Sequence, residues 1–96
     1  MIAFTSLLWI WKGKAAGRWH FLTVPEELSG AIRAHAFEIP RGFRSVRVEA
    51  RIGQVAWHTS VFPLDSGGYV LPVKADVRKR ARLSVGDEVK AVLTLL

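Results

Sequence analysis

The most regular alternation of apolar and polar residues in the chain runs over residues 43–52. From Val46 to Ile52 every second residue is apolar, and the residues between them are arginine or glutamate. This period of two is typical of a β-strand with one buried and one solvated face. Gly53-Gln54 follows, and a two-residue loop with glycine first suits the type II′ turn of a tight hairpin. The predicted register pairs Ala50 with Trp57, Val48 with Thr59 and Val46 with Val61 on the core face, and Glu49 with His58 and Arg47 with Ser60 on the outer face.

Four more segments beyond this hairpin have the composition of strands. Residues 2–11 and 18–24 are rich in β-branched and aromatic side chains, and residues 88–96 alternate again. Residues 69–73 form a short strand that Pro72 restricts to an edge or a strand end. Both faces of residues 2–11 are apolar toward the end of the segment, so we expect it to be covered on both sides or to lie at a subunit interface.

Two short helices are predicted from residues that recur at helical spacing. In residues 25–36 a proline suits the first helical position, and two glutamates follow in the first turn, where the helix dipole favours them. In residues 74–82 the apolar face is formed with Val73, Val77 and Ala81, and the basic residues lie away from it.

Six strands and two short helices, without alternation of strand and helix, predict a mainly β protein. We expect one domain over residues 1–96, folded as a small antiparallel barrel whose closure hides the strand edges. A weak internal repeat accompanies this plan. Residues 17–32 and 68–79 each run from a glycine through a strand and a proline into a helix. This order predicts two halves around an approximate two-fold axis.

The absence of cysteine and the apolar N-terminal run indicate the cellular location of the protein. The chain contains no cysteine, which excludes disulfides and thiolate zinc sites. The apolar N-terminal run has no basic residues before it, unlike a signal peptide, and it is shorter than the roughly 20 residues that a membrane-spanning helix needs. We therefore expect a cytoplasmic protein with no membrane insertion.

The formal net charge of +6 is unevenly distributed along the chain. Residues 41–82 contain nine basic and three acidic residues, which gives +6, whereas residues 1–40 give +1 and residues 83–96 give −1. A basic block of this kind attracts nucleic acid, phosphate ligands or an anionic surface. A solvated face that maintains solubility explains the same composition.

Residues suited to catalysis or metal binding are sparse. The histidines at positions 20, 35 and 58 do not stand at metal-ligand spacing, and a surface pair with Glu49 accounts for His58. No serine has the sequence context of a nucleophile, and the double glycine precedes a strand rather than a helix. We therefore predict no metal and no cofactor, and a binding protein rather than an enzyme. The four tryptophans favour core or interface positions over a base-stacking platform.

Several short motifs at compatible spacings resemble domain-of-unknown-function family 1905, over nearly the whole chain. These motifs are Trp19, Val24-Pro25, Arg41-Gly42, Trp57, Thr59-Ser60, Phe62-Pro63, Tyr69, Leu71-Pro72-Val73-Lys74, Val77-Arg78 and Gly86-Asp87. One departure is visible, because members often have tryptophan and glycine after the Arg-Gly pair, where this chain has Phe43 and Arg44.

The resemblance implies a bacterial type of protein with a double-split β-barrel and no established activity. That barrel is similar to the barrel of AbrB- and MazE-type transcription regulators, in which two chains build one barrel and grip DNA. The internal repeat then implies that one chain here corresponds to two chains of those regulators, because it contains both halves of the barrel. Fold likeness is an analogy for function, so it supports a hypothesis only.

Two binding hypotheses follow, and they use different residues. The first is a module for nucleic acid or another polyanion, with contacts from Arg44, Arg47, Arg51, Arg78, Lys79 and Arg82. The second is a small-ligand or protein-interaction barrel, with a pocket lined by Arg41, Thr59, Ser60, Tyr69 and Lys74. A protein partner or a second copy of the chain would bind through the apolar N-terminal strand.

Overall fold

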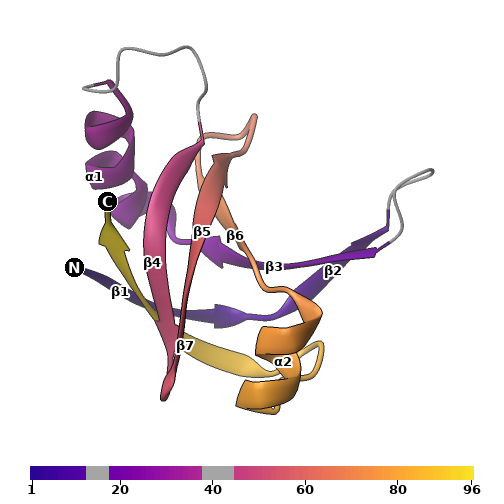
Figure 1. Cartoon of the computed structure of the whole chain (residues 1–96). Coiled ribbons are helices and arrows are strands. Elements are labelled where there is room, and N and C mark those ends of the chain that lie inside the picture. The colour runs from indigo at the N-terminus through magenta and orange to yellow at the C-terminus, as the bar shows by residue number, and fades with distance from the viewer. Residues whose placement is uncertain (13–17, 38–44) are drawn as a thin grey trace.

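The computed structural model describes residues 1–12, 18–37 and 45–96 (Figure 1). The elements are β1 (Ile2–Leu7), β2 (Trp9–Lys12), β3 (Arg18–Val24), α1 (Glu26–Phe37), β4 (Val46–Ile52), β5 (Val55–Pro63), β6 (Tyr69–Pro72), α2 (Ala75–Ala81) and β7 (Glu88–Leu95). The strands form one antiparallel sheet in the order β1-β7-β4-β5-β6-β3-β2. The prediction of a mainly β, antiparallel fold with two helices is therefore confirmed.

The β4–β5 hairpin has the register that the sequence predicts. All five predicted residue pairs are present, and the two-residue loop joins Ile52 to its partner Val55. Gly53 has a φ of 59°, whereas Gln54 does not have a positive φ. A type II′ turn requires this combination, since only its first central residue adopts a positive φ.

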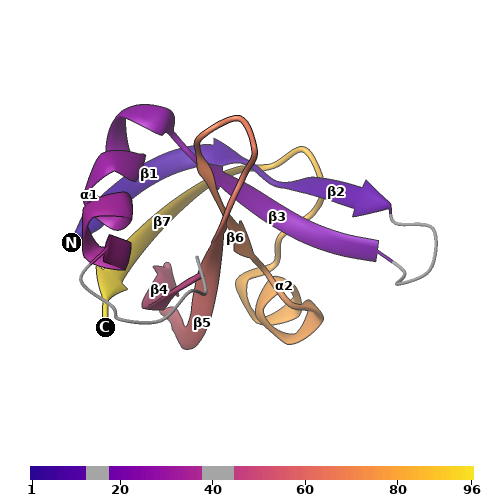
Figure 2. The same ribbon diagram turned by 90° about the horizontal axis from the view of Figure 1, so that it is seen from above.

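The prediction of six strands is wrong, because residues 2–11 do not form a single strand. The run breaks at Leu8, whose backbone N–H donates to Asp87 O at 2.9 Å and whose carbonyl accepts from Gly86 N at 2.8 Å. Before this break β1 pairs with β7, and after it β2 pairs with β3. The sheet consequently has seven strands, and β2 and β3 extend together away from the rest of the molecule (Figure 2).

The prediction of a closed barrel is also wrong, because the sheet forms a half-barrel. Two residue pairs, Phe62↔Val70 and Pro63↔Tyr69, join the C-terminal end of β5 to β6. The rest of β5 is not paired with β6. On the other side of β6 the ladder with β3 ends at the pair of Phe21 with Pro72. Beyond this pair the chain leaves β6 and turns into α2, joined to β3 by one more backbone bond. Helix α2 begins just beyond and packs against β5.

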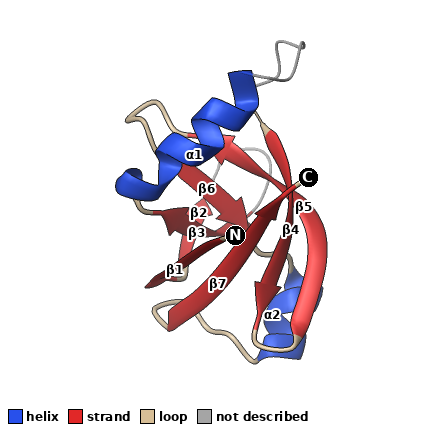
Figure 3. Ribbon diagram, turned by 90° about the vertical axis from the view of Figure 1, so that its left-hand side faces the viewer, coloured by secondary structure: helices blue, strands red, loops and turns tan. Residues whose placement is uncertain are grey.

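The two helices lie at opposite ends of the half-barrel (Figure 3). In α1, Ile32 and Ser29 are fully buried, and Ser29 Oγ donates to Pro25 O at 3.2 Å. Arg33 donates to Gly67 O, and His35 Nε2 lies 3.0 Å from Leu96 O. Neither helix in the described ranges is long and apolar enough to cross a membrane.

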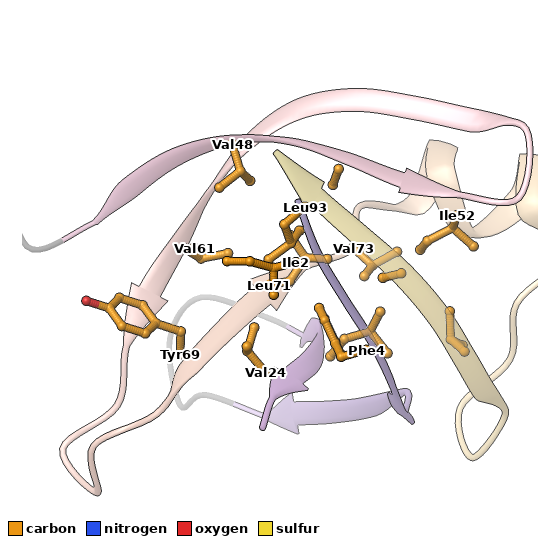
Figure 4. Packing of buried hydrophobic residues seen from close by; sticks show 14 of the residues in the cluster. Ile2, Phe4, Val24, Val48, Ile52, Val61, Tyr69, Leu71, Val73 and Leu93 are labelled. Atoms are coloured by element: carbon orange, nitrogen blue, oxygen red, sulfur yellow. The ribbon is translucent and has the colours of Figure 1, made fainter. Parts of the chain in front are cut away.

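The buried apolar side chains form one cluster inside the curved sheet (Figure 4). The cluster contains seven residues that the hydrophobic pattern places in the core, namely Val46, Val48, Ala50, Trp57, Val61, Val73 and Val77. Thr59, which was predicted on the same core face, is half-buried and does not belong to it. Tyr69 joins it at its margin and is only 4% exposed (Figure 4). The alternation read from the sequence therefore identifies the inner face of the sheet.

Helix α2 ends in a Schellman motif built on a residue other than glycine. Arg82 adopts the left-handed conformation with φ 57° and ψ 50°. Its N–H donates to Lys79 O at 3.3 Å, and the N–H of Leu83 donates to Arg78 O at 2.8 Å. These bonds satisfy carbonyls that the end of the helix leaves free.

Candidate functional site

An open cleft of about 350 Å³ lies where β6 passes into α2. The residues that line it come from β3, β5, the end of β6 and α2. They are Arg18, Trp19, His20, Trp57, Pro72, Val73, Lys74, Ala75 and Arg78.

The divergence of strands around β6 creates this cleft. The first three residues of β3 extend past the end of the β3–β6 ladder, and β5 has already departed from β6 on the other side. One backbone hydrogen bond, from Val73 N to His20 O at 2.9 Å, still holds the connection into α2 against β3. The backbone that frames the cleft is thus held to β3 on one side.

Three cations line the cleft, and none of its described lining residues is acidic. Arg78 is half-buried, and its Nη1 donates to Val73 O at 2.7 Å, which orients the guanidinium group. Arg18 and Lys74 are exposed at the rim. A positive charge held in a fixed orientation attracts an anion, and a guanidinium fork matches the oxygens of a phosphate.

His20 lies between these charges. Burial, followed by the positive charges of Arg78 and Arg18, holds the pKa of the His20 imidazole below its ordinary value. Its Nδ1 is shielded from solvent and has no hydrogen-bond partner among the described residues. The ring is therefore neutral near pH 7, and it is available to donate or accept one hydrogen bond.

Two tryptophans give the cleft an aromatic wall. Trp57 reaches it from the core face of β5 and is nearly buried. Trp19 remains 46% exposed, and its ring stacks on Phe21 with a centroid distance of 6.2 Å and an interplanar angle of 9°. The cleft thus combines cations with flat apolar surfaces.

The structure separates the arginines and lysine of the polyanion hypothesis into two groups. Arg47 and Arg51 are exposed on the outer face of β4, as the alternation predicts, and they do not line the cleft. Arg78 lines the cleft, and Lys79 and Arg82 are exposed on or beside α2. Arg44 lies outside the described residues.

Salt bridges neutralise little of the positive charge of the arginines and lysines in the described ranges. Arg80 pairs with Asp76 at 3.5 Å on the surface of α2, and no other salt bridge is present among residues 1–12, 18–37 and 45–96. Glu49 and His58 stand opposite each other across the hairpin, as predicted, without forming an ion pair.

The residues of the pocket hypothesis are not assembled in the cleft. Lys74 lines it, whereas Thr59 and Ser60 are half-buried on β5 and Tyr69 packs in the core at the far end of β6. Arg41 lies outside the described residues. Within the part of the chain that the structure describes, no three His, Asp or Glu side chains are grouped to hold a metal ion.

No local sequence pattern singles out Arg18, Trp19 and His20 as a group. Pro72 offered one signal, since a proline is typical of a strand end and β6 ends there. Using that signal requires knowing that Pro72 stands opposite Phe21, and this register joins segments about fifty residues apart.

Comparison with known proteins identifies the family. The model of the family described as Domain of unknown function (DUF1905) matches residues 4–93. This chain belongs to that family, as its motifs indicated. A search of the curated proteins found no match. The likeness to AbrB- and MazE-type regulators stays a prediction.

Proposed function

We propose that this member of the DUF1905 family is a binding module for nucleic acid or another polyanion. The observation that carries the proposal is the convergence of Arg18, Lys74 and Arg78 on one cleft whose described lining contains no carboxylate. Two of these three residues come from the basic block at 41–82, and Arg18 joins them through the fold.

The cations of the cleft are suited to bind phosphate groups. Arg78 is oriented by the Val73 carbonyl before any ligand arrives, so binding loses little side-chain entropy. Each phosphate that a cation neutralises releases counterions, which makes the affinity fall as salt rises. Lys79 and Arg82 are exposed on or beside α2, and Arg47 and Arg51 are exposed on the outer face of β4, so all four add to the long-range attraction of an anion.

Fluorescence anisotropy with labelled single-stranded and duplex oligonucleotides at several salt concentrations tests this proposal. Lys74→Gln removes one cation and leaves α2 intact, because the Lys74 side chain makes no capping hydrogen bond. We expect a two- to tenfold loss of affinity at roughly 50 mM salt and a decrease of about 0.7–0.9 in the slope of log K against log salt.

Lys90→Gln is the matched control, since it removes one exposed lysine on β7, which does not line the cleft. It should retain at least most of the wild-type affinity. Absence of binding to every oligonucleotide at low salt would refute the proposal, and an equal effect of the two variants would refute the cleft as its location.

A small anionic ligand is the second candidate, because the cleft volume falls within the range of small-molecule sites, about 300–1,000 Å³. Among the described residues first assigned to such a pocket, Lys74 alone lines the cleft. Thermal-shift measurements with pyrophosphate and mononucleotides separate the candidates. A small ligand should stabilise the protein as much as an oligonucleotide does, whereas a polyanion site should bind longer chains more tightly.

A further inference from the structure

One face of the β2–β3 hairpin carries four aromatic rings. Trp9 stands opposite Phe21, and Trp11 stands opposite Trp19. Residues two apart on a strand share a face, so all four side chains lie on the same side of the hairpin. We call this set of four residues the aromatic face.

Three rings of the aromatic face, those of Trp9, Phe21 and Trp19, are ordered against one another. Trp9 and Phe21 have a centroid distance of 5.3 Å and a tilt of 44°, and Trp19 lies nearly parallel to Phe21. The Trp9 Nε1–H donates to Thr23 Oγ1 at 2.9 Å, which fixes the orientation of the indole. These three rings form an ordered row of flat surfaces, and Trp11 stands opposite Trp19 at its outer end.

The outer end of this row is open to solvent. Trp11 is 48% exposed and Trp19 is 46% exposed, while the hairpin extends beyond the body of the molecule (Figures 1 and 2). Neither ring belongs to the main hydrophobic cluster. Two large apolar rings held in water in this way mark a binding surface.

The positive charge of the adjoining cleft indicates which class of ligand the aromatic face binds. Trp19 belongs to the aromatic face and is also among the residues that line the basic cleft. Its side chain projects from the face of β3 opposite to Arg18 and His20, so the two surfaces adjoin across this strand. An occupant that covers both must present flat apolar rings and negative charges along one molecule. Unpaired nucleotides have this combination, whereas a duplex keeps its base faces stacked inside the helix.

We propose that the aromatic face stacks the unpaired bases of single-stranded nucleic acid whose phosphates occupy the basic cleft. This inference rests on the proposed polyanion function and names its ligand class. Stacking of bases on aromatic side chains tolerates any sequence, because every base has a flat face. The module would therefore prefer single strands to duplexes and show little sequence preference.

The test compares three labelled probes of the same length: oligo-thymidine, its abasic counterpart with the same phosphates but no bases, and a duplex. Oligo-thymidine should bind about tenfold more tightly than the abasic strand and the duplex. Trp11→Ala and Trp19→Ala should each lower its affinity about tenfold. Trp11→Phe and Trp19→Phe should recover most of it, and binding of the abasic strand should not change in the Trp11 variants.

Phe37→Ala is the control, because it removes an exposed aromatic ring from α1, at the opposite end of the molecule, and should leave all affinities unchanged. Equal binding of the abasic and thymidine strands would overturn this inference and leave the polyanion function standing. Failure of all three probes at low salt would refute the polyanion function itself. A monomer–dimer equilibrium that Trp11→Ala abolishes without affecting DNA affinity would assign the aromatic face to a second copy and overturn the inference.

Discussion

His20 shows how one residue acquires its properties from two distant parts of the chain. Arg18 is its neighbour on β3, and Arg78 reaches the same cleft from α2. Both cations oppose protonation of the imidazole, and so does burial, which is the larger effect. The cleft therefore holds a neutral histidine beside fixed positive charges, a state that an anionic ligand would change.

The depressed pKa of His20 predicts a pH dependence of stability. Above the ordinary histidine pKa of about 6.5 the ring is neutral in both the folded and the unfolded chain. As the pH falls below this value, the unfolded chain takes up the proton first, so the contribution of His20 to stability decreases until the pH reaches its folded pKa. A ring-proton titration by NMR should give a midpoint below 6.5 for His20.

An anion in the cleft should raise that midpoint, because it offsets the charges of Arg78 and Arg18. Repeating the titration with a bound oligonucleotide measures this change. By linkage, oligonucleotide affinity should increase as the pH falls through this range. A His20 midpoint at or above 6.5 in the free protein would contradict the prediction.

At the scale of elements, α2 has the least expected feature of the fold. It is a short helix whose C-terminal left-handed position holds Arg82, where glycine is usual. The left-handed conformation is energetically unfavourable for a residue with a Cβ atom. A functional advantage of the positive charge would explain why arginine occupies position 82. Arg82 was one of the residues that the sequence assigned to polyanion contact.

Arg82→Gly should stabilise the protein by about 0.5–1 kcal/mol and weaken oligonucleotide binding through loss of the charge. Arg82→Ala is the matched variant, since it removes the same charge but keeps a Cβ atom, so the left-handed backbone stays unfavourable. The two variants should have equal affinities and different midpoints in urea unfolding. Equal midpoints would show that the left-handed position is not strained.

At the scale of the whole molecule, the half-barrel depends on β6 to join its two parts. This strand of four residues pairs with β5 on one side and with β3 on the other. Leu71, at its centre, is fully buried in the single hydrophobic cluster. The cleft lies beside the same junction, so the packing of β6 also determines the geometry of the site.

Leu71→Ala should reduce the free energy of unfolding by about 2–5 kcal/mol, because it leaves a cavity at this junction. Leu7→Ala, at an exposed position on β1, should change it by less than about 0.5 kcal/mol. Since one cluster spans both parts of the sheet, urea unfolding should remain a single transition for each protein. Two resolved transitions would contradict this account of the core.

Local patterns determined much of the fold before any coordinates were known. The β4–β5 register followed from alternating residues and a glycine-first turn, and the position of α2, to within one residue at each end, followed from the spacing of Val73, Val77 and Ala81. In each case the interacting residues are close in the chain, so backbone geometry specifies which of them meet. Membership of the family followed from motifs that are also readable in sequence.

The site depended on contacts between residues far apart in the chain. Leu8 looks like the interior of one long strand, and only its bonds to Gly86 and Asp87 divide that strand in two. Arg18 and Arg78 are sixty positions apart and carry ordinary local signals. Local patterns in the sequence were sufficient to specify the inner face of the sheet, the turn between β4 and β5 and the excess of positive charge. The tertiary structure alone decided which charges meet, because strand pairing over such distances is set by the packing of the whole core rather than by local geometry.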